Sequence, residues 1–508
     1  MKNLSFNIFI FFLLINLLVT GGRIASSDET ATFLLVESIV HRGSLDVPPG
    51  IIQNGSFHNG KFYIWYEIGQ SLLAIPLYLT GYAITSLIDL PPAMKILVLK
   101  ACMGTFNAFI GALYAVCMFL FSQKLGYKLR TSLLLTVGLC VSTFAFPYLK
   151  TFLREPLLAL ALLGTCYFLH QWSINTTSQR FLLLAGILTG IGVLTRTAFI
   201  INVLPMVFFI FAMVWNIENK IDKAIRASIM FLLPIFMAGL GILWYNYARF
   251  GNPFDLGYQS AGISFDIPFY VGLYGLLLSS GKSFFLFAPL TIVGIVGLQM
   301  LFRKRVVSVY LWIAIIAINL LFYSKYYAWG GDGSWGPRYL LSLLPFFVLP
   351  VGEIIEKGQK ISKIVISTLI LIGVIFQLAG TSIYAGTYLR EIGEFPYTRS
   401  FTEPEFLYKA HFIPNYSPIV GHWRMALHNF KEHLSGNIPT IQLNEDAQAT
   451  RIPIQEENTS SLRHTFDYWF CYPLYVGYRS IIFFIVPLLM VLLIIIQWLR
   501  LRRMVSRT

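Results

Sequence analysis

Residues 481–496 read IIFFIVPLLMVLLIII, an apolar run without one polar side chain. Phe181–Ile191 is a second, nearly unbroken run, and crossing a bilayer as a helix takes about 20 mostly apolar residues. Backbone groups inside lipid have to pair within their own segment, so these runs predict helices. A membrane β-barrel would show alternating segments of about ten residues, which this sequence lacks. The pattern predicts an all-α polytopic membrane protein.

Composition leads to the same class. Of the 508 residues, 56% are hydrophobic and 12% are charged, whereas a soluble domain carries about 25% charged residues. The five cysteines show neither a CxxC pair nor a Cys/His spacing typical of zinc. The sequence therefore gives no sign of a disulfide framework or a structural metal.

The apolar runs predict about twelve transmembrane helices. One further stretch, residues 66–88, is apolar but contains Pro76 and Gly81. Whether it crosses the membrane decides the orientation of everything that follows it. The predicted spans are 5–20, 96–121, 131–148, 156–172, 181–195, 198–216, 227–245, 284–302, 307–323, 339–356, 364–381 and 480–499.

The distribution of Lys and Arg favours twelve spans with both termini in the cytoplasm. In that arrangement the inner loops and tail carry the whole formal net charge of +14, and the outer segments are neutral. This matches the excess of basic residues that cytoplasmic loops carry. A thirteenth span would divide the basic clusters between the two faces, so residues 66–88 are predicted to lie in or dip into the outer interface. The basic surplus needs no nucleic-acid partner.

The predicted organisation places the chemistry on the non-cytoplasmic face. A transmembrane core covers residues 1–381 and includes a first outer loop at about 21–95. An extracytoplasmic segment follows at 382–478, and residues 479–508 form the last helix and a basic tail. Residues 1–22 also resemble a signal peptide, but an uncleaved anchor is favoured because it tethers the following acidic pair to the membrane. A bacterial inner membrane suits this arrangement.

The acidic pair Asp28-Glu29 directly follows the first apolar run. A carboxylate at a membrane interface could serve as a general base. The alternative is a helix N-terminus, capped by Ser27, with both acids in the first turn. Spacing alone favours the cap.

Charged residues also interrupt the apolar runs farther along the chain. Arg196 divides the stretch 181–215, where it could grip a phosphate with two parallel hydrogen bonds or extend to the interface. Arg154 and Glu155 precede Pro156, which is typical of a helix start. A helix start does not explain why charges cluster there in so apolar a chain.

A glycine-rich stretch, YYAWGGDGSWGPRY, covers residues 326–339 and includes Asp332 and Arg338. Glycines let the backbone approach a ligand, and aromatic faces suit sugar rings. An interfacial aromatic belt explains the rings but not the two charges. Lys282 lies in a small basic turn without the spacing of a phosphate-binding Walker loop. The histidines lack metal-ligand spacing, so neither a metal nor a cofactor is predicted.

Together these motifs resemble the GT-C membrane glycosyltransferases. The resemblance is strongest to bacterial polyprenyl-phosphate-sugar transferases related to protein O-mannosyltransferases and lipid A aminoarabinose transferases, and it covers about residues 1–350. It departs from the family where Glu155 follows Arg154, and residues 382–478 match no known acceptor domain. The residues that carry it are Asp28-Glu29-Thr30, Glu37, Gly43–Asp46, Tyr63–Gly81, Glu155-Pro156 and Trp335–Tyr339.

The resemblance implies a role for each candidate residue. Asp28 would be the general base and Glu29 would orient it or bind the sugar, with inversion at the anomeric carbon. The donor would be a polyprenyl-phosphate-linked sugar, and the acceptor a glycan, lipid or protein. The competing hypotheses are a transporter or flippase of lipid-linked sugars, and a polysaccharide polymerase or ligase. The remaining substrate-binding candidates are Glu155, Arg196, Arg338, Lys282, Arg154 and Asp332.

Overall fold

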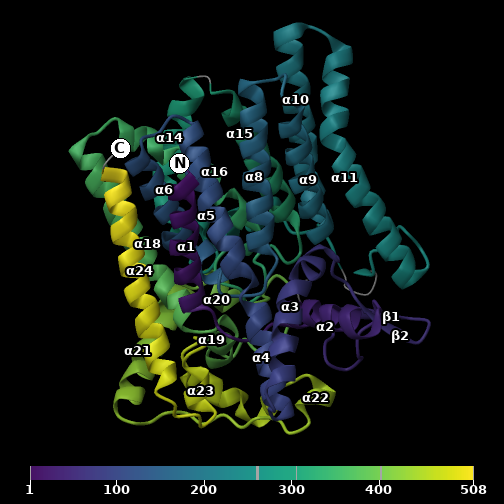
Figure 1. The fold of residues 1–508 in the computed structure, drawn as a ribbon, viewed down its shortest axis with the longest axis vertical. Helices are drawn as coiled ribbons and strands as arrows, with labels where there is room; N and C mark the ends of the chain where they lie inside the picture. The colour runs from purple at the N-terminus through teal and green to yellow at the C-terminus, as the bar shows by residue number, and fades with distance from the viewer. Residues whose placement is uncertain (1, 259–262, 305, 401–402, 507–508) are drawn as a thin grey trace.

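A computed structural model describes residues 2–258, 263–304, 306–400 and 403–506. Within these residues the chain is a bundle of long helices with one small β-hairpin (Figure 1). The bundle consists of α1 (Lys2–Val19), α4 (Pro92–Gly104), α5 (Phe106–Lys124), α6 (Leu129–Ser142), α7 (Ala145–Tyr148), α8 (Glu155–Ile174), α9 (Gln179–Thr195), the 3₁₀ helix η1 (Thr197–Asn202), α10 (Val203–Glu218), α11 (Ile221–Phe250), α12 (Phe269–Leu278), α13 (Phe284–Phe287), α14 (Leu290–Arg303), α15 (Val307–Lys325), η3 (Arg338–Leu343), α16 (Leu344–Val348), α17 (Val351–Glu356), α18 (Lys360–Ser382) and α24 (Ile482–Ser506).

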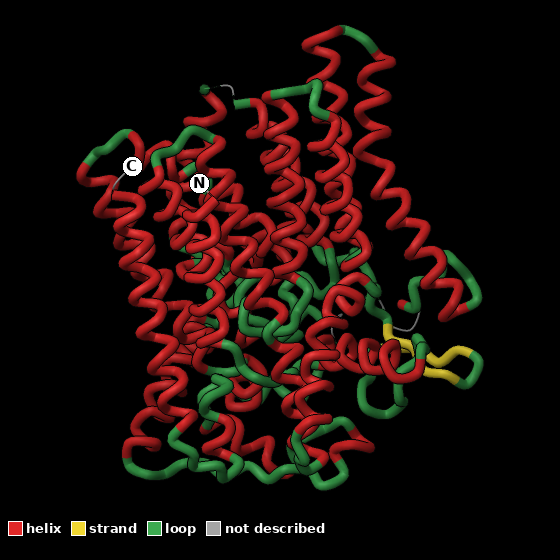
Figure 2. Tube along the Cα trace, in the orientation of Figure 1, coloured by secondary structure: helices red, strands yellow, loops and turns green. Residues whose placement is uncertain are grey.

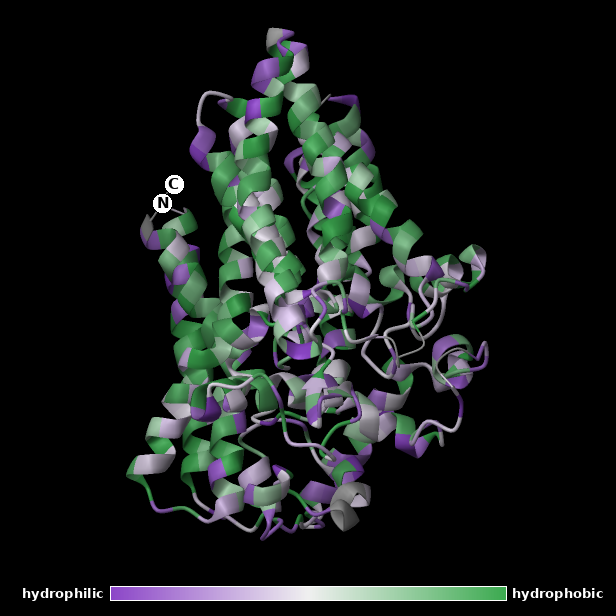
Figure 3. Ribbon diagram, turned by 90° about the vertical axis from the view of Figure 1, so that its right-hand side faces the viewer, coloured by the Kyte–Doolittle hydropathy of each residue, from purple (hydrophilic) through white to green (hydrophobic). Residues whose placement is uncertain are grey.

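The all-α membrane class is confirmed. Eight segments of the described chain are helices long and apolar enough to cross a membrane, and five shorter helices are also apolar. The last helix, α24, is apolar on all sides and almost wholly exposed, as expected of a helix that contacts lipid. Figure 3 shows hydrophobic residues along the long helices, with hydrophilic residues gathered near their ends and in the loops. Length and composition alone do not reproduce the predicted number of twelve spans.

Three predicted stretches differ in detail. The predicted span 339–356 is divided into η3, α16 and α17, because Pro345 and Pro350 have no N–H to continue a helix. The predicted span 131–148 stops at Ser142, beyond which α7 forms a separate short helix. The predicted loop 246–283 contains the helix α12, which packs on α15 so closely that a Cβ at Gly272 would lie 1.9 Å from the Ser324 carbonyl oxygen.

The first outer loop folds as a compact unit. It contains α2 (Ser27–Arg42), a hairpin of β1 (Gly55–His58) and β2 (Lys61–Ile64), and α3 (Gly69–Leu87). Its helices share a second hydrophobic core with α4, separate from the main core of the bundle. In Figure 1, α2 runs across the long axis of the bundle, and Figure 2 shows the hairpin projecting from its side.

Helix α3 corresponds to the ambiguous stretch 66–88, and it is not among the helices apolar enough to cross a membrane. Ala74, Tyr78 and Gly81 are buried at helical spacing against neighbouring helices. The opposite face is exposed and yet rich in large apolar side chains, among them Leu72 and Leu79. A helix with this pattern is suited to lie along a membrane surface, as the charge distribution predicts.

Both termini lie at one end of the bundle, whereas most of segment 382–478 lies towards the other end (Figure 1). This segment is irregular, as its prolines predict, and it forms short helices and turns. Its elements are α19 (Ala385–Glu391), α20 (Tyr408–Phe412), η4 (Pro414–Tyr416), α21 (Pro418–Leu434), α22 (Ala447–Thr450), η5 (Glu456–His464) and α23 (Tyr472–Tyr475).

A buried ion triad fastens this segment to the bundle. The Asp467 carboxylate lies 2.8 Å from Nε of Arg23 and 2.6 Å from Nζ of Lys150. The Arg23 guanidinium also lies over the rings of Tyr384 and Tyr472. Since these charges are removed from solvent, neither cation can exchange its partner for water without a large cost. The two cations hold the pKa of Asp467 below its usual value, although burial alone would raise it.

We expect Asp467→Asn to destabilise the protein by about 3–5 kcal/mol, because it leaves two buried cations without their carboxylate. Thermal unfolding in nanodiscs and protease cleavage within 382–478 would measure the effect. Glu403→Gln is the matched control, since it removes an exposed partner of Arg399 that contributes at most about 1 kcal/mol. Equal stability of the two variants would contradict a fastening role for the triad.

Candidate active site

The site begins at the N-terminus of α2, where a capping box fixes the chain. The Ser26 hydroxyl accepts a hydrogen bond from the Glu29 N–H, and the Glu29 side chain accepts one from the Ser26 N–H at 2.9 Å. The sequence suggested Ser27 as the cap, but the residue that caps α2 is Ser26. Spacing could not distinguish these two adjacent serines.

Glu29 uses both carboxylate oxygens for this scaffold. One oxygen accepts from Ser26 and from the Ala25 N–H, and the other accepts from the Phe152 N–H at 2.6 Å. Glu29 thereby ties the start of α2 to the turn before α8. Three roles were considered for Glu29: a helix cap, an orienting partner for Asp28 and a contact with sugar. Since both oxygens are engaged with backbone N–H groups, the geometry favours the helix cap.

Asp28 instead directs its carboxylate towards other side chains. One oxygen accepts hydrogen bonds from the Tyr66 hydroxyl at 2.6 Å and the Asn54 amide at 3.1 Å. The other lies 3.2 Å from Nη1 of Arg338. Burial alone would raise the pKa of Asp28, but Arg338, Arg154 and the Tyr66 hydrogen bond outweigh it and hold that pKa below the usual value for an aspartate. Asp28 is therefore ionised at neutral pH.

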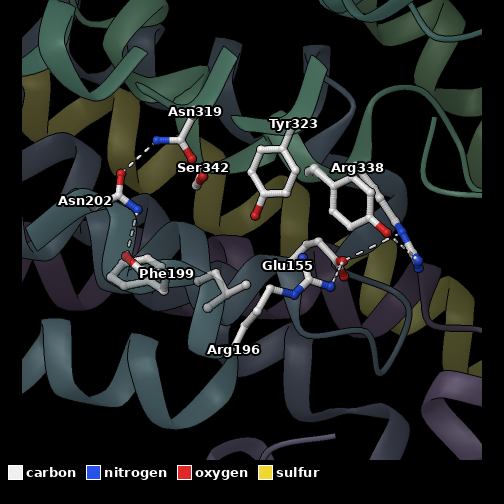
Figure 4. Close-up of a pocket in the computed structure, with 10 residues that line it drawn as sticks. Glu155, Arg196, Phe199, Asn202, Asn319, Tyr323, Arg338 and Ser342 are labelled. Atoms are coloured by element: carbon white, nitrogen blue, oxygen red, sulfur yellow. Dashed lines mark hydrogen bonds and ion pairs between the residues drawn. The ribbon is translucent and has the colours of Figure 1, made fainter. Parts of the chain in front are cut away.

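Arg338 is the centre of the site. Besides Asp28, its guanidinium lies 3.4 Å from the Asp332 carboxylate and 3.8 Å from that of Glu155. Glu155 also pairs with Arg196 at 3.1 Å, and the Arg196 guanidinium lies over the ring of Tyr339. The candidates from four separate regions of the sequence thus converge in space, as Figure 4 shows for Glu155, Arg196 and Arg338.

These residues line a narrow polar space of about 20 Å³, which we call the arginine cleft. It lies between α8, η1, α15 and η3, and the break at Arg196 between α9 and η1 directs that side chain into it. Asn202 and Asn319 lie farther along the cleft and are linked by a hydrogen bond of 2.7 Å (Figure 4). Buried polar residues in membrane helices usually mark functional positions. Sequence reasoning missed both, although their position inside apolar runs was a usable signal.

A second space, which we call the large cavity, lies on the other side of Arg338. Its volume is about 350 Å³, and Arg338 lines both this cavity and the arginine cleft. Asp28 and Asp332 lie in its wall, and segment 382–478 contributes residues including Tyr384 and Tyr397. Asp332 has a left-handed backbone (φ 57°), between glycines that allow the tight loop. Burial raises the pKa of Asp332, and the nearby Asp28 carboxylate adds to the rise, although Arg338 opposes both.

Two predicted substrate-binding residues lie outside both spaces. Arg154 pairs with Glu67 at 2.9 Å and lies over the ring of Tyr66, so it supports the tyrosine that holds Asp28. Nζ of Lys282 donates to the carbonyl oxygens of Asp332 and Ser334, and this anchors the glycine-rich loop. Burial, together with nearby Arg338, lowers the pKa of Lys282 to about 7. Tyr66, Asn54 and Glu67 were not identified from the sequence, because each acts only through its neighbours in space.

No group of three His, Cys, Asp or Glu side chains in the described part of the chain is placed to hold a metal ion. By sequence, no protein-family model and no curated protein matches the chain.

Solved structures do resemble it. The oligosaccharyltransferase of Archaeoglobus fulgidus, solved with a tethered acceptor peptide containing an NVT sequon, superimposes with a TM-score of 0.51 at 13% identity. The match covers 83% of this chain and 63% of the archaeal one, so this chain spans less than two thirds of that enzyme. ArnT from Cupriavidus metallidurans, bound to undecaprenyl phosphate, has a TM-score of 0.46 at 12% identity, over 91% of this chain and 75% of ArnT. The likeness to the oligosaccharyltransferase shows that the chain has the GT-C fold predicted from its motifs.

Proposed function

We propose that this protein is a membrane glycosyltransferase that moves a sugar from a polyprenyl-phosphate-linked donor to an acceptor on the non-cytoplasmic face. One observation carries the proposal. A carboxylate suited to act as a base, Asp28, contacts the guanidinium of Arg338, which lines both the large cavity and the arginine cleft. An acceptor in the cavity and a donor phosphate in the cleft would therefore meet beside Asp28.

In the proposed reaction Asp28 takes the proton from an acceptor hydroxyl or amine. The acceptor atom forms a bond to the anomeric carbon while the bond from that carbon to the phosphate oxygen breaks. Polyprenyl phosphate leaves with the bonding electrons, and the sugar is inverted. Asp28 ends protonated and returns the proton to water.

The arginines supply the electrostatic part of the mechanism. Negative charge grows on the phosphate as the bond breaks, and fixed cations in a water-poor site stabilise it strongly. Arg196 and Arg338 share Glu155, which holds both guanidinium groups at the same cleft. A phosphate with several oxygens can replace some of these carboxylate contacts by paired hydrogen bonds.

A transporter or flippase of lipid-linked sugars is the competing hypothesis. Sites in such proteins tend to lie at the interface between structural repeats near the bilayer midplane. The charged residues here lie at helix starts and in loops beside a walled cavity. This placement favours catalysis over transport. A polysaccharide polymerase or ligase, the other alternative, would differ in using diphosphate-linked donors.

We expect Asp28→Asn to lower sugar transfer by about 10²–10⁴-fold, because the base is lost while the hydrogen bonds with Tyr66 and Asn54 can persist. Purified protein in nanodiscs, supplied with polyprenyl-phosphate hexoses and pentoses, would show this as loss of labelled product. Donor binding should be retained, and the loss of stability should be smaller than in Asp467→Asn, because Glu155 and Asp332 still compensate Arg338. Glu29→Gln is the contrasting variant, for which we expect a lower melting temperature and a smaller loss of transfer. Full transfer by Asp28→Asn would refute the base assignment.

We expect Arg196→Ala to raise the donor KM more than Asp28→Asn does, because it removes a cation from the arginine cleft. Initial rates at varied donor concentration would measure the change. Arg180→Ala is a suitable control, since Arg180 lies in the first turn of helix α9 and does not line the cleft. Equal donor KM values in Arg196→Ala and the parent would contradict a phosphate-binding role.

The pH dependence of kcat/KM provides a separate test, since this ratio reports groups of the free enzyme. The pKa of Asp28 is lowered, so its base form persists as pH falls and is lost only below the ordinary carboxyl range. We therefore expect kcat/KM to show no loss on the acid side down to about pH 5. Half of the activity lost near pH 6 would point to a different base.

A further inference from the structure

We propose that the large cavity binds an uncharged sugar ring of a glycan acceptor, presented to Asp28 by the protein's own segment 382–478. This inference rests on the proposed function and adds to it the chemical class of the acceptor. It follows from which residues build the wall, from the balance of charge in that wall, and from the shape that aromatic and glycine residues give it.

Two parts of the chain line the large cavity. The bundle contributes Asp28 and the glycine-rich loop, which carry the reacting groups. Segment 382–478 contributes Tyr384, Phe395 and Tyr397 on the facing side. The segment is fixed in place by the Asp467 triad, and Asp467 itself lines the cavity. An acceptor bound here would touch both the base and the segment.

The charge of the wall is balanced. Its charged residues are four cations, Arg23, Lys150, Arg338 and Arg390, and four acids, Asp28, Glu29, Asp332 and Asp467. Asp467 engages two of the cations, and Arg338 engages Asp28 and Asp332. Binding sites for phosphorylated ligands place cations in excess, often as paired arginine contacts. This wall has no such excess, so it favours an uncharged acceptor.

The shape suits a ring. Phe395 and Tyr397 pack edge to face with ring centroids 5.2 Å apart, and Tyr397 approaches Gly333 beside Asp332. A Cβ at Gly333 would press on a methyl group of Leu389, so glycine lets the loop and the segment pack here without displacing that side chain. Aromatic faces with polar edges are suitable surfaces for sugar rings. The volume of about 350 Å³ is within the range of small-molecule sites.

A peptide acceptor is the competing class. Extended peptides are commonly bound by adding a strand to an exposed sheet edge. The strands of the described chain, β1 and β2, do not line this cavity. The lining therefore offers a peptide no backbone ladder, whereas it offers aromatic faces and hydroxyl groups to a sugar.

The test uses the full-length protein in nanodiscs with labelled polyprenyl-phosphate hexoses and pentoses. Three acceptor probes are compared: octyl glycosides of neutral sugars, the same glycosides carrying a 6-phosphate, and a peptide containing Ser and Thr. We expect transfer to the neutral glycosides to be the most efficient. Transfer of the sugar to water is measured in parallel and reports donor turnover without any acceptor.

Variants connect the preference to the cavity. We expect Tyr397→Ala to raise the KM for the neutral glycoside about ten-fold, while Tyr397→Phe stays within about three-fold because it keeps the ring. Tyr408→Ala is the matched control, since Tyr408 belongs to the same segment, is half exposed and does not line the cavity.

The outcomes separate this inference from the proposed function. Donor turnover with a preference for the phosphorylated glycoside or the peptide overturns the acceptor class and leaves the glycosyltransferase assignment intact. If Tyr397→Ala and Tyr408→Ala have the same KM for the neutral glycoside, the assignment of the acceptor site to this cavity is also overturned. If the donor is turned over neither with any of the three probes nor with water, both the proposed function and this inference are overturned.

Discussion

The arrangement of the site depends on the charge of one buried guanidinium. Arg338 is compensated by Asp28 from α2, Glu155 from the start of α8 and Asp332 from the glycine-rich loop. A cation removed from water is costly unless carboxylates or hydrogen-bond acceptors surround it. The three segments can therefore not move apart independently. The convergence that makes the site chemically useful is the same convergence that makes Arg338 tolerable in the interior.

The residues around Arg338 also pair their buried charged groups with partners. Glu29 satisfies backbone N–H groups at two places, so the residue beside the proposed base is committed to holding that base in position. Arg154 and Glu67 form another buried pair and support Tyr66. The Asp467 triad repeats the principle at the boundary with segment 382–478. Each of these ion pairs joins elements that are distant in sequence.

The class of fold could be predicted because lipid imposes long apolar runs. The charge distribution set residues 66–88 apart from the spans, and α3 is not among the helices apolar enough to cross a membrane. The candidates Asp28, Glu155, Arg196 and Arg338 were identified because isolated charges are conspicuous in so apolar a chain, and the structure brings them together. Arg154 and Lys282 were equally conspicuous, but their partners lie outside the cleft and cavity. A charged residue shows in sequence that it needs a partner, not which partner it finds. Asn54 and Tyr66 carry no charge and so gave no signal.

The contact between Asp28 and Arg338 has a consequence for the order of events. A carboxylate beside a cation is a weaker base than one that has lost it. A phosphate arriving in the cleft would compete for the same guanidinium and leave Asp28 with its tyrosine and amide partners. Occupancy of the cleft and proton affinity at Asp28 would then be thermodynamically linked, each increasing the other. Such an enzyme would keep its base quiescent until the donor is in place.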